Sequence, residues 1–142
     1  MAAEALGRIG DRRALEPLIQ ILPAAGGDLG LYVAQALGEV GDQRAVPALI
    51  EESRRREEPE LRGVAEALGR IGDPRAVPAL ISLLQTGKED VRCAAAVALG
   101  RMADPRAVAP LRKARSSDPQ DFVREAAASA LRKLDADALP ER

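Results

Sequence analysis

Apolar residues recur along this chain at helical spacing, and the pattern returns every 31 residues. A leucine opens the same short phrase in each copy, at Leu6-Gly7, Leu37-Gly38, Leu68-Gly69, Leu99-Gly100 and, 32 residues later, Leu131. A fixed period of roughly 20 to 50 residues is typical of stacked repeat arrays. The pattern therefore predicts a repeat protein and not a globular enzyme fold.

Residues 73–102 show how one repeat is built. Asp73 suits a helix N-cap, and Pro74 suits the first helical position, where its missing N–H costs nothing. A stripe of apolar residues then follows the spacing of one helix face: Ala76, Val77, Leu80, Ile81 and Leu84. After a break, a second stripe follows: Val91, Ala95, Ala98, Leu99 and Met102. Each repeat is therefore predicted to be a helical hairpin.

An aspartate and an arginine follow each of the first four Leu-Gly pairs. The aspartates, which mark the predicted repeat boundaries, are Asp11, Asp42, Asp73 and Asp104, and the arginines are Arg13, Arg44, Arg75 and Arg106. Copies at one repeated position are expected of helix caps and of a ladder between repeats, not of a single active site. Gly10, Gly41 and Gly72 precede three of the aspartates, where a helix ends best on a left-handed residue, but Ala103 breaks that pattern.

Prolines stand near the fifth or sixth position of the first helix in four repeats: Pro17, Pro47, Pro78 and Pro110. At those positions each would remove one backbone hydrogen bond and bend its helix. The alternative is that each helix begins later and that the preceding residues form a turn.

The fold expected from these patterns is an all-α solenoid of about four and a half hairpins and about nine helices. We expect one domain over residues 1–142, with a C-terminal cap and tail from about residue 119. The chain starts inside a Leu-Gly helix, so Leu6 and Ile9 would be incompletely covered. An unfinished N-terminal face is therefore predicted, so the chain is expected either to be a fragment of a longer array or to self-associate through this face.

Composition narrows the function classes. The chain has 21 basic and 22 acidic side chains, no histidine and one cysteine, Cys93. The balanced charge disfavours nucleic acid and membranes as partners. Without histidine, and with a lone thiol that nothing activates, we expect no catalytic residues, no metal site, no cofactor and no enzymatic activity. A single cysteine also indicates a reducing compartment, so the chain is expected to be cytoplasmic.

Two segments resemble a known family. Residues 69–81, Gly-Arg-Ile-Gly-Asp-Pro-Arg-Ala-Val-Pro-Ala-Leu-Ile, and residues 91–100, Val-Arg-Cys-Ala-Ala-Ala-Val-Ala-Leu-Gly, resemble the HEAT-like repeat first described in phycobilisome lyases. The resemblance implies a right-handed superhelix of antiparallel helix pairs, with the Leu-Gly helices on the concave face. The family includes bilin lyase subunits, adaptors and hydroxylases with paired His-Glu metal sites, and the lack of histidine excludes the last group here.

On such a concave face, aligning the repeats to Leu99 gives rows of exposed side chains. The residues predicted to form the binding surface are Arg8, Glu39, Arg70, Arg101 and Lys133 in one row, Gln35, Glu66, Val97 and Ser129 in the next, and Tyr32, Arg62, Cys93 and Glu125 a turn earlier. Tyrosine and arginine are favoured in interface hot spots. The alternative is that pairs such as Glu66 and Arg70, spaced i,i+4, only decorate a solvated helix.

The function expected from these observations is a non-catalytic scaffold that presents its concave surface to a partner protein or peptide. The main alternative is a subunit related to bilin lyases, which would handle a tetrapyrrole or its carrier protein together with a partner subunit. A nucleic-acid binder is a third class, disfavoured by the balanced charge and by the presence of only two aromatic residues.

Overall fold

The structure of the chain is a computed structural model, and it describes residues 12–55 and 59–136. Within these ranges every regular element is helical, with five short 3-10 turns between longer helices. The α-helices are α2 (Leu15–Ile21), α3 (Gly27–Val40), α4 (Val46–Arg55), α5 (Glu60–Ile71), α6 (Val77–Thr86), α7 (Glu89–Met102), α8 (Val108–Ser117) and α9 (Asp121–Ala136). The expected all-α class is confirmed.

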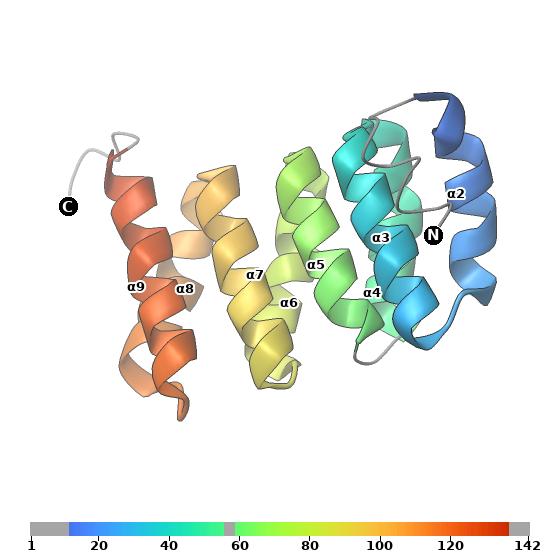
Figure 1. Cartoon of the computed structure of the whole chain (residues 1–142). Coiled ribbons are helices and arrows are strands. Elements are labelled where there is room, and N and C mark those ends of the chain that lie inside the picture. Colours follow the sequence, from blue (N-terminus) through green and yellow to red (C-terminus); the bar gives the residue numbers. More distant parts are fainter. Residues whose placement is uncertain (1–11, 56–58, 137–142) are drawn as a thin grey trace.

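The helices form two layers that run along the molecule. Figure 1 shows α3, α5, α7 and α9 side by side in one layer, with α4, α6 and α8 behind them and α2 beside α3 at one end. Neighbouring helices of the first layer pack closely, whereas α4, α6 and α8 touch one another at few places. A stack curves towards its more closely packed layer, so α3, α5, α7 and α9 line the concave side of this α-solenoid.

The glycine of each Leu-Gly pair makes this close packing possible. A Cβ atom placed on Gly38 would lie 2.8 Å from the Ala67 Cα, and one placed on Gly69 would lie 2.8 Å from the Ala98 Cα. Gly100 meets Ala130 on α9 in the same way, also at 2.8 Å. Real Cβ contacts are never this short. The repeated glycine is therefore required by the short distance between the helices α3, α5, α7 and α9, which we call the inner helices.

The core is one continuous seam of leucine, valine and alanine between the two layers. Each repeat contributes fully buried leucines, and those of the inner helices are Leu37, Leu68, Leu99 and Leu134. Alanines fill the remaining space, because the two aromatic residues of the sequence, Tyr32 and Phe122, are not part of this core. Each hairpin thus covers the apolar surface of the next, as repeat arrays require.

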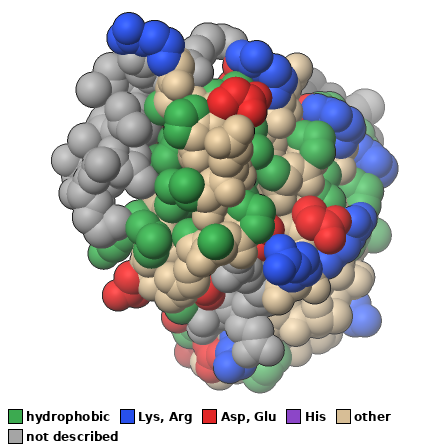
Figure 2. Space-filling view, turned by 90° about the vertical axis from the view of Figure 1, so that its right-hand side faces the viewer, with side chains coloured by type: hydrophobic (Ala, Val, Ile, Leu, Met, Phe, Trp, Pro, Cys, Tyr) green, Lys and Arg blue, Asp and Glu red, His purple; other side chains and the backbone are tan. Residues whose placement is uncertain are grey.

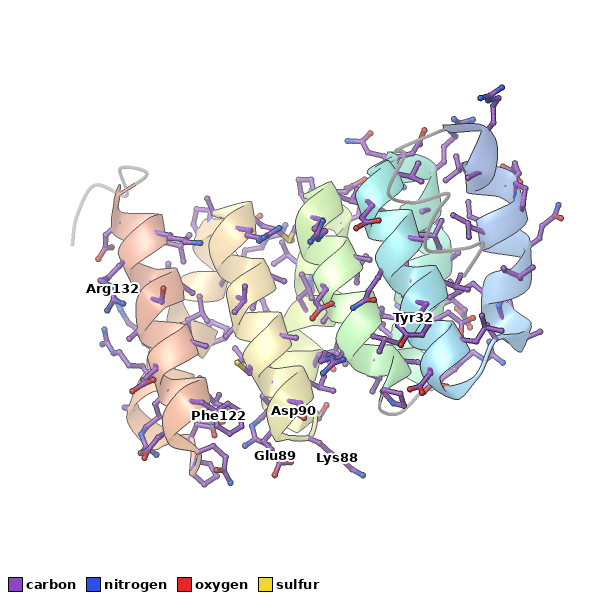
Figure 3. The ribbon with its side chains drawn as sticks, in the orientation of Figure 1. Tyr32, Lys88, Glu89, Asp90, Phe122 and Arg132 are labelled. Atoms are coloured by element: carbon purple, nitrogen blue, oxygen red, sulfur yellow. The ribbon has the colours of Figure 1, made fainter. Side chains whose placement is uncertain are left out.

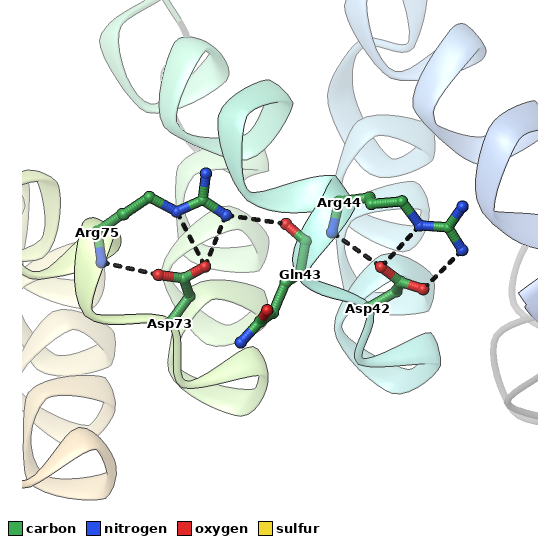
Figure 4. A network of polar contacts seen from close by, with 5 residues as sticks. All are labelled: Asp42, Gln43, Arg44, Asp73 and Arg75. Carbon is green, nitrogen blue, oxygen red and sulfur yellow. Dashed lines mark hydrogen bonds and ion pairs between the residues drawn. The ribbon is translucent and has the colours of Figure 1, made fainter.

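The Asp-x-Arg element serves as a cap and as a link between repeats (Figure 4). Asp42 Oδ1 accepts a hydrogen bond from the backbone N–H of Arg44 at 2.8 Å, and Asp73 Oδ1 does the same for Arg75 at 2.9 Å. The Arg75 guanidinium also donates to the backbone carbonyl of Gln43 in the preceding repeat, at 3.4 Å. The next repeat has the same contacts, made by Arg106 to Asp104 and to Pro74. The predicted caps are confirmed at Asp42, Asp73 and Asp104, and the predicted ladder at Arg75 and Arg106. Asp11 lies outside the described residues.

The predicted bends at proline are wrong, and the alternative is correct. The first α-helix of each repeat begins later than expected, after a 3-10 turn such as Gln43–Ala45 or Pro74–Ala76. Pro47 and Pro78 therefore stand second in α4 and α6, and Pro17 and Pro110 stand third in α2 and α8. In the first turn a proline has no intrahelical hydrogen bond to lose, so it fits without a bend.

The sequence predicts an unfinished face at the N-terminal end of the molecule and a cap at its C-terminal end. Leu6 and Ile9 lie outside the described residues, so the predicted unfinished face stays a prediction. Figure 2 shows the α2 end, where hydrophobic side chains gather near the middle of the face. Ile21 of α2 is 44% exposed. At the opposite end α9 fills the described part of the predicted C-terminal cap, whose boundary also stays a prediction.

Among the described helices, none has both the length and the apolar content needed to cross a membrane.

Candidate functional site

A cavity of about 420 Å³ opens on the concave side between α5, α7 and the first turn of α9. We call it the concave cavity. Its lining residues are Arg62, Glu66, Arg70, Asp90, Cys93, Ala94, Val97, Ala98, Arg101 and Phe122. The three rows predicted from sequence contribute six of these ten side chains.

The repeat period explains why these six residues meet. Arg62, Glu66 and Arg70 are four residues apart along α5, so they lie on one face of that helix. Each has its equivalent 31 residues later on α7: Cys93, Val97 and Arg101. Because α5 and α7 are neighbouring inner helices, the two sets stand side by side across the cavity.

The three arginines of the cavity have no acidic partner in the part of the chain that the structure describes. Within residues 12–55 and 59–136, no hydrogen bond or ion pair engages the guanidinium group of Arg62, Arg70 or Arg101. The Nε atom of Arg62 is moreover buried without a hydrogen-bond acceptor. A buried donor left unsatisfied costs about 1 to 3 kcal/mol, so the observed position of the Arg62 side chain carries an energetic cost.

Glu66 does not neutralise these arginines. Its Oε1 accepts a hydrogen bond from the Gln35 side chain, at 3.1 Å, across the α3–α5 contact. No ion pair joins it to Arg70 in the described part of the chain. The alternative that Glu66 and Arg70 form a decorative i,i+4 pair is therefore not supported by the geometry.

The cavity also exposes two large apolar side chains among its charged ones. Val97 is 45% exposed and Phe122 is 42% exposed, which are high values for large hydrophobic side chains. Figure 3 shows Phe122 and Asp90 at the same end of their helices, α9 and α7. The cavity thus combines an exposed apolar surface with unpaired cationic groups.

Cys93 lies in the wall of the cavity and is half-buried. Burial raises the pKa of its thiol, and the nearby Asp90 carboxylate raises it further. The thiol is therefore protonated at neutral pH, which makes it a weak nucleophile.

The remaining predicted residues lie outside the cavity. Those on α3 are Tyr32, Gln35 and Glu39, those on α9 are Glu125, Ser129 and Lys133, and Arg8 is outside the described residues. Figure 3 shows Tyr32 on α3, one helix away from the cavity walls formed by α5 and α7. The predicted surface is thus longer than the cavity that the fold forms.

Sequence reasoning missed four lining residues: Asp90, Ala94, Ala98 and Phe122. Asp90 and Phe122 each lie three residues before a predicted residue, Cys93 and Glu125. Continuing that row by one helical turn would have found both. Ala98 had been assigned to the core, where it is also buried, and Ala94 had no signal of its own.

The described residues contain no group of three or more histidine, cysteine, aspartate or glutamate side chains that could hold a metal ion.

The fold and the cavity define the class of protein: an α-solenoid with a concave cavity. The family follows from comparison with known sequences. The profile of HEAT repeats matches residues 1–68 and 47–132. These matches span most of the chain, which therefore belongs to the HEAT-repeat family. No curated protein matches the sequence.

Two solved structures illustrate the similarity. One is human deoxyhypusine hydroxylase in complex with glycerol, at 25% identity and a TM-score of 0.66, covering 95% of this chain and 67% of that one. The other is the complex of CpcE and CpcF of phycocyanin lyase from Nostoc sp. PCC7120, at 24% identity and a TM-score of 0.65, covering 99% and 67%.

These neighbours correct one expectation. The prediction that the chain is not an enzyme was wrong, because the similar structures include a hydroxylase and subunits of a lyase. The comparison therefore gives no ground for excluding enzymatic activity. The lack of histidine limits the side chains that such a role could use, but it does not exclude the role.

Proposed function

We propose that this chain is a helical scaffold that binds a partner protein through the concave cavity. The single observation that carries the proposal is the set of three arginines without acidic partners, placed around an exposed valine and an exposed phenylalanine. Membership of the HEAT-repeat family supports a scaffold of this shape.

Physical chemistry favours a partner at this place. Exposed charges that serve only solubility are stabilised by i,i+4 ion pairs. Arg70 forms no such pair with Glu66, because the Glu66 carboxylate accepts a hydrogen bond from Gln35 instead. Arginine and aromatic side chains are enriched at the centres of interfaces, where they contribute much of the binding free energy. A partner that brings acceptors to the arginines and apolar surface to Val97 would satisfy both parts of the cavity.

The test is an affinity purification with matched variants. Changing Arg62, Arg70 and Arg101 together to glutamine removes three positive charges from the cavity. Changing Arg112, Arg115 and Arg132 to glutamine removes the same charge from exposed positions outside it. We expect the cavity variant alone to lose its partner, measured by quantitative mass spectrometry of the captured proteins. Equal capture by both variants would contradict the proposal.

A second candidate function is a lyase-related role in which the chain handles a tetrapyrrole or its carrier protein. The similarity to the CpcE and CpcF complex supports it weakly. The cavity adds one specific observation, because arginines beside an apolar surface fit a flat conjugated molecule that carries carboxylates. An absorbance change when free bilin is titrated in, lost in the cavity variant, would support this role. No change, with or without a partner subunit, would reject it.

We also propose that the chain works in the cytoplasm and does not bind nucleic acid. The single, half-buried thiol suits a reducing compartment, and the formal net charge is −1. A salt-sensitive shift of a DNA duplex in a gel would contradict the second statement.

A further inference from the structure

We infer that the concave cavity binds a short extended peptide segment that is acidic at the Arg70 and Arg101 end and carries an apolar side chain against Val97. This inference rests on the proposed function, and it names the chemistry of the partner.

The cavity has the length of such a segment. Arg62 and Arg70 are eight residues apart on α5, which is about 12 Å along the helix axis. An extended chain rises about 3.3 Å per residue, so roughly four residues cover that distance. The groove between α5 and α7 therefore accommodates a peptide of this length along the helices.

Its charges are arranged unevenly. Arg70 and Arg101 occupy equivalent positions in the last turns of α5 and α7, so two unpaired guanidinium groups lie together at one end. The middle holds Val97 opposite Glu66, whose carboxylate already accepts from Gln35. The other end combines the unsatisfied Arg62 with Phe122.

Carboxylates suit the end that Arg70 and Arg101 form. Arginine pairs with carboxylates through two parallel N–H···O bonds, which are about twice as strong as neutral hydrogen bonds. Their place in the last helical turn explains a positive charge through the helix dipole. It does not explain why neither arginine forms an ion pair within the described residues, although Glu66 lines the same cavity.

A peptide fits better than a nucleic acid. A phosphate backbone carries a charge at every nucleotide and would meet the carboxylates of Glu66 and Asp90 in the cavity wall. A peptide places its acidic residues next to the arginines and an uncharged, apolar one next to Glu66 and Val97. The charge pattern of the wall thus selects discrete carboxylates separated by an apolar group.

The test uses fluorescence anisotropy with a labelled probe peptide in which glutamates flank a single leucine. We expect saturable binding that weakens as salt is added. Arg62→Gln, Arg70→Gln and Arg101→Gln together should weaken it about tenfold or more, since each lost contact to a charged group is large. The matched triple of Arg112→Gln, Arg115→Gln and Arg132→Gln should bind as the unchanged protein does.

Further arms identify the source of the carboxylates. A twin peptide with glutamine in place of glutamate should not bind, and free succinate at the peptide's concentration should not displace the probe. Displacement by succinate would overturn the peptide assignment in favour of a small carboxylate. If the triple variant does not fold, the exposed pair Arg70→Glu and Arg101→Glu serves instead, and it should bind a lysine twin of the probe in preference to the glutamate one.

The outcomes separate this inference from the proposed function. If the probe does not bind, or binds both triples equally, the inference is wrong. If the cavity variant nevertheless loses its cellular partner, the proposed function stands with a partner of other chemistry. If that variant keeps both the probe and the partner, both statements are wrong.

Discussion

Each described inner helix that is followed by another repeat ends at a residue with the left-handed backbone conformation. Gly41 and Gly72 have φ values of 74° and 75°, and Ala103 takes the same conformation at 56°. Glycine adopts this region freely, whereas a side chain at Cβ crowds the backbone. Ala103 is the only residue other than glycine with a positive φ in the described part of the chain. One repeat is therefore strained at a point where its neighbours are not.

Replacing Ala103 by glycine should relieve this strain. We expect Ala103→Gly to raise the free energy of unfolding by about 1 kcal/mol. The reciprocal change, Gly72→Ala, should lower it by a similar amount, because a Cβ there meets no atom within 4 Å and adds only backbone strain. Urea unfolding followed by circular dichroism would measure both. A loss of stability in Ala103→Gly would contradict this account.

At the scale of the helices, two kinds of contact determine their positions relative to one another. The repeated kind is the glycine-to-alanine approach of inner helices. The unrepeated kind is Arg92 of α7, which donates to both carboxylate oxygens of Asp118, at 2.7 and 3.0 Å, and to the carbonyl of Gly87 at 3.0 Å. Arg92 thus joins the ends of α6 and α8 to the start of α7. Leucine stands at the equivalent place one repeat earlier, Leu61, so the period did not predict this contact.

Substituting Gly69 tests the repeated contact. A Cβ at Gly69 would lie 2.6 Å from the Ala98 Cβ, so α5 and α7 must move apart. We expect Gly69→Ala to lower the free energy of unfolding by about 1 to 3 kcal/mol. Alanine is the better helix former by about 1 kcal/mol, so intrinsic propensity works in the opposite direction. A thermal melt showing unchanged or higher stability would refute the close approach.

The Arg92–Asp118 pair predicts a pH dependence. Hydrogen bonding to Arg92 lowers the pKa of the Asp118 carboxyl below its ordinary value. A lowered folded-state pKa gives stability that is complete above the unfolded pKa, about 3.9, and is lost as pH falls through the folded value. Asp118 is 7% exposed in this pair, so screening by water is weak.

We expect Asp118→Asn to unfold at lower urea concentration than the unchanged protein at pH 7, by about 2 kcal/mol. The difference should shrink towards pH 2, since the unchanged protein then loses the same ion pair. Asp121→Asn, at an exposed carboxylate, is the control and should keep the acid dependence. A constant difference across pH would mean that the ion pair does not stabilise the fold.

At the scale of the molecule, stability is shared between neighbouring hairpins. A hairpin of about 31 residues cannot offset its own ordering entropy, roughly 1.5 kcal/mol per residue, without a neighbour that covers its apolar side. The continuous core from Leu15 to Leu134 meets this need within the described residues.

The exposed apolar patch at the α2 end keeps self-association a testable prediction (Figure 2). We expect the molar mass from light scattering to rise with concentration, and Ile21→Lys to reduce that rise because it puts a charge into the patch. Phe122→Lys, at the concave cavity, is the control and should leave the rise unchanged. A mass independent of concentration in the unchanged protein would contradict this prediction.

The period of the sequence predicted more of the site than its composition did. It brought Arg62, Arg70 and Arg101 onto one surface, because residues one repeat apart occupy equivalent places on neighbouring helices. It could not show where that surface becomes a cavity. The concave cavity depends on which lining side chains are small and on the position of Phe122 in the first turn of α9. Neither follows from residue spacing alone.

The amino-acid sequence by itself determined the helical hairpins, the caps and the residues of the apolar seam, since each follows from the spacing of residues along the repeat. Only the tertiary structure decided which charged groups remain unpaired. Gln35 engages Glu66 and Asp118 engages Arg92, while the cavity arginines have no partner within the described residues. Ion pairs depend on side-chain positions between helices, and a sequence period fixes which helices are neighbours but not how their long side chains meet.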